Sequence, residues 1–322
     1  MTKHYLSVFL LLVFLIPDWI RAQEAESFTR ADFQLQGPVE TCVVKANYGE
    51  ERFEFDRKGR LVKSLTRYSD SDYDITYYRF KDGLLSERRD EVYRGKTFDA
   101  QTSIAHIYQR DSAQGPRLIE NIISYDKSFT EQVEYRYDEG GRLERILRSN
   151  AEGVDETVLE YTVYREESTT TYVRNGLPLR SIRVSNSVSG GKARRIELTK
   201  EFLDGEPRTA VEKSLDAAGR LVREVLFSYD AAKKSFRPEE TRSYTYNEDG
   251  YRVEEKTIYH PPANSRAADR TEVRSYVYQM DGEQPGNWIR QIITPENSFV
   301  IRTISYFEPL PETVVADSVQ QR

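Results

Sequence analysis

The sequence predicts an all-β protein, an antiparallel meander of hairpin repeats that forms an extended, twisted or curled sheet. Three observations support this fold class. Aromatic residues recur in pairs two positions apart, a polar corner ending in glycine follows most of these pairs, and 22 tyrosines and 14 phenylalanines accompany a charged fraction of 31%. Such a chain has too many aromatic residues to be disordered. Its rings must therefore provide most of the buried surface.

The clearest copy of the repeat runs from Tyr135 to Ile146. Tyr135 and Tyr137 emerge on one face of an extended chain, which predicts the end of a strand. Asp138 can accept hydrogen bonds from the backbone ahead of it, and glycine adopts positive φ at little steric cost. Alternation resumes after the glycine pair, so the segment is predicted to be a hairpin.

The first 22 residues have the features of an export signal. Lys3 precedes an apolar run from Leu6 to Ile16, and Ala22 is a small residue of the kind that ends a cleavage site. The run is too short to span a membrane comfortably. We expect cleavage near Ala22, no stable transmembrane segment afterwards, and a periplasmic or extracellular location, the cell surface included.

The mature chain is predicted to have three parts. Residues 23–38 form a lead-in that holds a short helix or remains loose, residues 39–308 form the β-repeat domain, and residues 309–322 form a flexible tail. Cys42, the only cysteine, cannot form an intrachain disulfide and fits a small buried strand residue.

Other stretches repeat the same pattern less completely. Further strands and hairpins are predicted within residues 39–46, 52–63, 78–87, 119–137, 160–174, 214–223, 244–253 and 276–290, and loops at 185–192 and 260–269. The spacing between corner glycines is irregular, so the meander is not a strict periodic array.

The pattern Tyr-x-Tyr-Asp-x-x-Gly-Arg-Leu at 135–143 resembles the YD repeat of the rearrangement hot-spot family. The Gly286-Asn287-Trp288 ending is similar to a variant in short exported members from Bacteroidetes-type bacteria. The resemblance implies a long antiparallel sheet wound as a ribbon. It does not imply toxicity, because this chain has no Asp-Pro dipeptide for the family's self-cleavage and is too short to enclose a toxin domain.

The paired aromatics are the candidate ligand-facing residues, since aromatic rings on a sheet can stack on sugars. The alternative is that they only pack against the next hairpin and against arginine stems. The candidates are Tyr135, Tyr137, Tyr244, Tyr246, Tyr276, Tyr278 and Trp288.

Catalytic and metal-binding motifs are not convincing. The mature chain has two histidines, His106 and His260, and Ser124 to Lys127 fits Ser-x-x-Lys without the companion motifs. Asp70, Asp72 and Asp74 alternate as cation ligands do, but the spacing does not match a helix-flanked calcium loop, so a solvated acidic loop is the other interpretation. No cofactor is predicted.

The sequence therefore favours an exported, non-catalytic binding or scaffold module at the cell envelope, with a glycan or a surface protein as partner. A formal net charge of −6 argues against nucleic acid. The alternatives are a hydrolase acting on polysaccharide through a carboxylate pair and an outer-membrane β-barrel.

Overall fold

The structure is a computed structural model, and it describes residues 27–47, 49–112, 115–262, 265–282 and 286–309. One short 3₁₀ helix precedes a long series of strands. The elements are η1 (Arg30–Phe33), β1 (Val39–Ala46), β2 (Gly49–Phe55), β3 (Leu61–Arg67), β4 (Tyr73–Lys81), β5 (Leu84–Arg94), β6 (Thr97–Asp111), β7 (Arg117–Ser124), β8 (Thr130–Tyr137), β9 (Leu143–Asn150), β10 (Gly153–Tyr164), β11 (Glu167–Arg174), β12 (Leu177–Ser189), β13 (Lys192–Leu203), β14 (Glu206–Leu215), β15 (Leu221–Asp230), β16 (Ser235–Tyr246), β17 (Arg252–Tyr259), β18 (Arg270–Met280), β19 (Trp288–Thr294) and β20 (Ser298–Tyr306).

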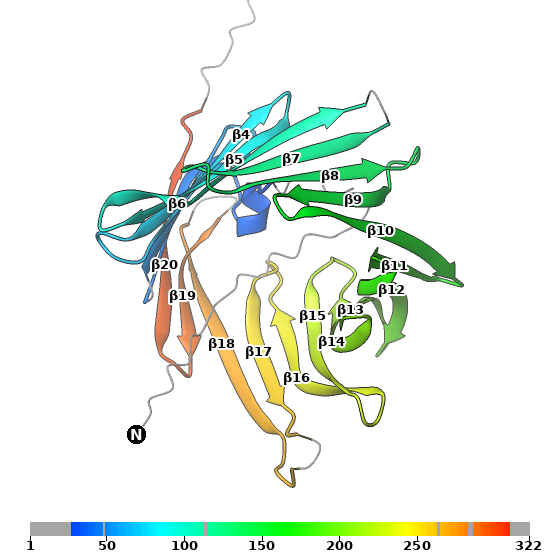
Figure 1. The fold of residues 1–322 in the computed structure, drawn as a ribbon. Coiled ribbons are helices and arrows are strands. Elements are labelled where there is room, and N and C mark those ends of the chain that lie inside the picture. Colours follow the sequence, from blue (N-terminus) through cyan, green and yellow to red (C-terminus); the bar gives the residue numbers. More distant parts are fainter. Residues whose placement is uncertain (1–26, 48, 113–114, 263–264, 283–285, 310–322) are drawn as a thin grey trace, which may run out of the picture.

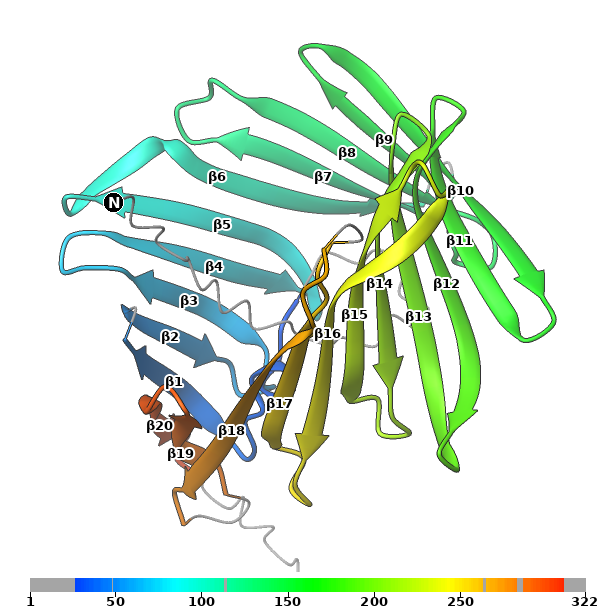
Figure 2. The same cartoon turned by 90° about the horizontal axis from the view of Figure 1, so that it is seen from below.

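The strands close into a 20-stranded barrel. Each strand pairs antiparallel with the next, and β1 pairs antiparallel with β20, with Val44 opposite Arg302 and Val39 opposite Tyr306. Figures 1 and 2 show the resulting ring from two directions. The all-β antiparallel prediction is confirmed. The extended or curled sheet was wrong, because pairing between the first and last strands removes both free edges.

Consecutive strands run in opposite directions, so all connections that follow even-numbered strands lie at one end of the barrel. We call this end the corner rim, because it carries the predicted corners that begin at Asp56, Asp138, Asp216 and Asn247. The hairpin predicted at Asp138 is confirmed: β8 pairs with β9 through a register shift, and Gly141 has φ +79°. Both chain ends of the barrel, Val39 and Tyr306, also lie at this rim.

Two predicted loops have different outcomes. Residues 185–192 were expected to form a loop, but β12 and β13 extend through nearly all of them, because Gly190 and Gly191 at φ +58° and +72° complete the reversal alone. The loop predicted at 260–269 does separate β17 from β18. The predicted signal peptide and tail lie outside the described residues, except for Pro309.

The pairing also assigns every strand residue to one of two faces, because directly opposed residues share a face. Figure 1 shows the blue turn of η1 inside the ring of strands. The Phe33 ring of η1 lies 4.4 Å from the ring of Phe53, so Phe53 points inward and its neighbours Arg52 and Glu54 point outward. Following the register around the ring from these residues identifies the inner and outer faces of all strands.

The N-terminal segment, residues 27–38, is fixed to the inner wall on both sides of the β1–β20 seam. Arg302 of β20 donates from Nη2 to the Phe33 carbonyl (3.1 Å). The fully buried Asn287 accepts from the Gln36 N–H (2.8 Å) and donates to the Gln36 carbonyl (2.9 Å). On the other side, the backbone N–H of Arg30 donates to the Gly59 carbonyl (2.9 Å).

Candidate functional site

The repeat corners share one local design. At the 138 corner, Asp138 Oδ1 accepts the backbone N–H of Arg142, and Oδ2 accepts its Nε–H, both at 2.8 Å. The backbone hydrogen bond from Arg142 is the main reason why the pKa of Asp138 is lowered. Asp56 with Arg60 and Asp216 with Arg220 repeat the same contacts. These carboxylates stabilise their turns, and their oxygen atoms already accept hydrogen bonds from residues of the same corner.

Each corner arginine also contacts an aromatic residue on the second strand after its corner. Arg142 lies 5.3 Å from the ring centre of Tyr161, and the Tyr161 hydroxyl donates to the Leu143 carbonyl (2.5 Å). The 216 corner repeats this arrangement with Arg220 and Tyr246 at 5.0 Å. The Tyr246 hydroxyl donates to the carbonyl of Leu221, the first residue after the corner (2.6 Å). Each repeat is therefore joined to its neighbour at the rim.

The candidate aromatics on β8 are packed against other parts of the wall. Tyr135 is on the inner face, and its hydroxyl donates to Glu120 Oε2 (3.1 Å). Tyr137 packs against the inner core near η1.

The candidates at the end of the chain form a second group on the inner side. Tyr244 and Trp288 are 8% and 5% exposed, and Arg302 covers the Trp288 ring at 3.5 Å. The hydroxyl of Tyr276 donates to Glu255 (3.0 Å), and that of Tyr278 donates to the Arg252 carbonyl (2.7 Å). The structure thus gives these rings packing and hydrogen-bonding roles, and ligand binding by them stays a prediction.

A polar network lies on the inner wall of β5, β6 and β7. His106 Nδ1 lies 2.7 Å from Glu120 Oε1, and His106 Nε2 lies 2.8 Å from Arg88 Nη2. Because arginine can only donate, this geometry fits the neutral tautomer that carries its proton on Nδ1. Asp90 accepts from Arg88 Nε (3.0 Å) and from the Thr76 hydroxyl (2.8 Å). The sequence identified His106 only as an isolated histidine, because its partners come from two other strands.

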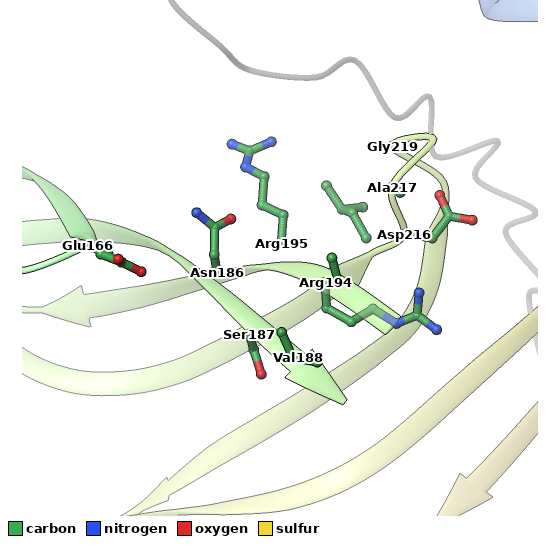
Figure 3. Close-up of a pocket in the computed structure, with 11 residues that line it drawn as sticks. Glu166, Asn186, Ser187, Val188, Arg194, Arg195, Asp216, Ala217 and Gly219 are labelled. Atoms are coloured by element: carbon green, nitrogen blue, oxygen red, sulfur yellow. The ribbon is translucent and has the colours of Figure 1, made fainter. Parts of the chain in front are cut away.

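A pocket of about 470 Å³ opens at the corner rim, between the ends of β12 and β13 and the 216 corner. Asn186 and Arg195 are directly opposed on the inner face and point the same way in Figure 3. Leu215 is directly opposite Arg195 on β14, and Glu166 and Asp216 contribute carboxylates from two neighbouring connections. A guanidinium, an amide and two carboxylates around an apolar residue can bind a small polar molecule.

Sequence analysis missed the pocket because residues 185–192 had been assigned to a loop. Asp216 is also committed to its corner: burial opposes its ionisation, but the backbone N–H and the guanidinium of Arg220 outweigh burial and lower its pKa. The pocket's other polar groups come mainly from β12, β13 and the β10–β11 connection.

The acidic stretch at 70–74 is built into a turn. Asp72 accepts the backbone N–H of Gly95 (2.9 Å), which is the main reason why its pKa is lowered, and it also accepts the Ser69 hydroxyl (3.1 Å). Asp74 binds Tyr68 and Arg94 instead. Within the described parts of the chain, no group of three or more His, Cys, Asp or Glu side chains is placed to hold a metal ion. Those same parts contain no helix long and apolar enough to cross a membrane.

No protein-family model matches this chain, and no curated protein matches it either. Among solved structures, a porin-like protein from Bacteroides uniformis is 10% identical over 83% of this chain and 96% of its own, with a TM-score of 0.35. A porin-like protein from Bacteroides vulgatus is 11% identical over 84% of this chain and 99% of its own, with a TM-score of 0.22. At these scores neither structure adds to what the strand pairing establishes.

The resemblance to the rearrangement hot-spot family was wrong. No family model supports it, and consecutive strands close a barrel where the resemblance implied a long sheet wound as a ribbon. The closed barrel supports the outer-membrane β-barrel, an alternative raised from the sequence, better than it supports a binding or scaffold module built on a curled sheet.

Proposed function

We propose that this protein is an integral β-barrel of the bacterial outer membrane and that it is not an enzyme. The observation that carries the proposal is the pairing of β1 with β20. A sheet without edges satisfies all its backbone hydrogen bonds internally, which is the condition for a β-structure to cross a bilayer. In water the same closure is only one of several ways to protect edges.

The distribution of apolar and charged side chains on the outer face supports this proposal. Apolar side chains occupy outward positions several residues from the corner rim on most strands. They include Val43, Leu65, Ile75, Ile107, Ile123, Leu147, Val158, Leu198, Val225, Phe227, Ile258, Val273, Ile292, Phe299 and Ile301. Outward apolar residues set back from the rim are the expected lipid-facing band of an outer-membrane barrel.

Many outward ion pairs lie close to the corner rim. Arg79 pairs with Glu87 (2.9 Å) near the ends of β4 and β5, and Arg136 pairs with Glu134 (2.8 Å) near the end of β8. Charges at that height would lie among lipid head groups, where they cost far less than at the bilayer centre. The inner wall is polar at mid-strand, as the network around His106 illustrates, and this too is typical of such barrels.

Membrane fractionation tests the proposal. The full chain is produced with its own leader in a Gram-negative host, and outer membranes are separated from a periplasmic extract and washed with alkaline carbonate. We expect the protein to stay with the outer membrane and to migrate faster on a gel when unheated. Recovery from the periplasmic extract would contradict the proposal.

Two arginine substitutions on one strand sharpen this experiment. Phe299 and Ser305 both point outward on β20, but Ser305 is next to the corner rim and Phe299 is at the other end. Phe299→Arg should reduce the amount of protein in the membrane, since arginine costs up to about 2–4 kcal/mol inside the bilayer. Ser305→Arg should leave it unchanged. Equal behaviour of the two variants would mean that β20 does not face lipid.

A water-soluble exported barrel that acts as a binding or scaffold module is the second candidate. The outward charges at mid-strand favour it, because Arg52, Arg89 and Lys256 interrupt the apolar band. This second candidate would bind a glycan or a surface protein. The rim pocket is the concave site available for such binding. The fractionation above separates the two candidates directly.

A further inference from the structure

The outer face of β18, β19 and β20 carries a group of exposed apolar side chains. Val273, Val277, Ile292 and Phe299, here called the seam patch, are 44%, 59%, 41% and 50% exposed. Val277 is directly opposite Ile292, which is directly opposite Phe299, so three of the four side chains form one row across the strands. Val277 and Ile292 lie within their strands, and Phe299 is the second residue of β20.

Part of the border of the seam patch is short and polar. Ser275 and Thr294 take two of the outward positions around it, and Lys256, Gln279, Arg290 and Ile301 take others. Outward apolar residues inside other strands can be covered: Ile75 is 9% exposed and Val225 is 2% exposed. Long side chains surround those residues, whereas a surface of small polar and apolar side chains can be approached closely by a second flat surface.

Two opposite charges flank the patch at the same height. Glu254 is two residues from the start of β17, and Arg290 is two residues from the start of β19; both strands start at the corner rim. Both side chains point outward and are exposed. Arg290 lies over the Phe299 ring at 4.9 Å. Within the described part of the chain, neither charge forms an ion pair.

We propose that the seam patch is the contact surface for a second copy of this chain, related by a two-fold axis that runs beside β18. The proposal rests on the outer-membrane assignment, because a membrane gives both copies the same corner-rim direction. The axis then brings β17 of each copy against β19 of the other at equal height. Glu254 of each copy then contacts Arg290 of the other copy, which gives two equivalent ion pairs. Val277 and Ile292 of both copies pack at the centre of the interface.

A second copy fits this surface better than acyl chains alone. Acyl chains would cover the apolar row but would offer no carboxylate to Arg290 and no cation to Glu254. The symmetric copy supplies both from residues that already stand on either side of β18. The exposed Lys256 lies one outward position farther from the rim, opposite Val273, and its aliphatic stem can lie along the same interface.

Cross-linking in isolated outer membranes tests the contact. The full chain carries Cys42→Ala, which removes the buried inner-face thiol, together with either Val277→Cys or Thr162→Cys. Thr162 is exposed and points outward on β10, away from the patch. A short bismaleimide should join the Val277→Cys protein into a dimer and leave the Thr162→Cys protein monomeric. Equal cross-linking of both variants, or of neither, would overturn the proposal.

A charge exchange tests the pairing itself. Glu254→Arg and Arg290→Glu should each lower the dimer fraction several-fold, and the double variant should restore it. Each single variant keeps the exposed position charged, so the barrel should fold, and unheated gel mobility checks this. Failure of the double variant to restore the dimer contradicts the Glu254–Arg290 contact. Because the same cells are fractionated, loss of membrane location is seen separately from loss of the dimer.

Discussion

The two halves of the barrel are built from the same corners but are packed differently inside. Along β1 to β7 the inner wall joins a continuous core with η1, which includes Phe33, Cys42, Phe55 and Leu61. Around β15 and β16 the corresponding cluster contains only a few residues, among them Leu221 and Tyr244. The repeat therefore produces a paired strand and a fixed corner, but not a core. The N-terminal segment supplies the second surface that turns one half of the wall into a core.

The strongest way to test this difference is to truncate a leucine in each half. Leu61→Ala removes a side chain that is 2% exposed in the packed half and should cost about 3 kcal/mol. Leu226→Ala, on the half-buried inner face of β15, should cost about 1 kcal/mol, because less of its side chain is buried. Urea unfolding of the refolded barrel measures both. Equal losses would mean that the N-terminal segment adds no core.

Two asparagines at comparable corners provide the next test. Asn287→Ala leaves the N–H and the carbonyl of Gln36 without their partner, and should cost about 2 kcal/mol. Asn247→Ala removes the acceptor of the Tyr251 N–H and a long bond to the exposed Asp249 (3.5 Å), and should cost about 1 kcal/mol. Hydrogen exchange should rise at residues 28–36 only in the first variant. An unchanged exchange rate there would show that Asn287 does not anchor the segment.

Two corner glycines allow a finer comparison. Gly59 and Gly141 have φ of +86° and +79°, so alanine costs about 1 kcal/mol at either corner through backbone strain. A Cβ on Gly59 would also meet Arg30 Nε at 2.7 Å, whereas nothing lies within 4 Å of one on Gly141. Gly59→Ala should therefore be the less stable variant in urea, and the difference disappears if Arg30 can move aside freely.

The smallest expected effect is on the pH dependence of stability. The pKa of Asp138 is lowered in the folded chain, mainly by the Arg142 backbone N–H, so its contribution is present above the pKa of an unfolded aspartate, about 3.9. That contribution is lost as the pH falls through the lower folded value. Asp138→Asn keeps an acceptor, as Asn247 does naturally, and should flatten the acid end of a stability curve. A curve identical to that of the wild type would mean that Asp138 has no linked proton.

Local parts of this fold were predictable because their causes are local. The turn at Asp138 and the strands on either side follow from alternation, from a capping carboxylate and from a glycine at positive φ. Closure was not predictable, since no feature of residues 39–46 or 298–306 marks them as partners. Which ring faces inward depends on closure, so the environments of Tyr135 and Tyr278 could not be derived either.

The candidate site shows the same division. The Gly-Asn-Trp ending drew attention to Asn287 and Trp288, but the contact of Asn287 with Gln36 comes from the far end of the chain. Trp288 packs under Arg302 of the next strand, β20. The rim pocket was hidden because a serine-rich and glycine-rich stretch looks like a loop, although only two glycines are needed to reverse the chain.

The β1–β20 seam has a consequence for biosynthesis. Arg302 holds a carbonyl 269 residues earlier in the chain, so nearly the whole polypeptide must be made before this bond can form. Contacts this distant in sequence slow folding, and an unclosed sheet exposes two edges to other chains. The nascent protein should therefore depend on chaperones until its last strand emerges. Because β1 and β20 lie side by side, a circularly permuted gene opened at another hairpin could encode the same ring.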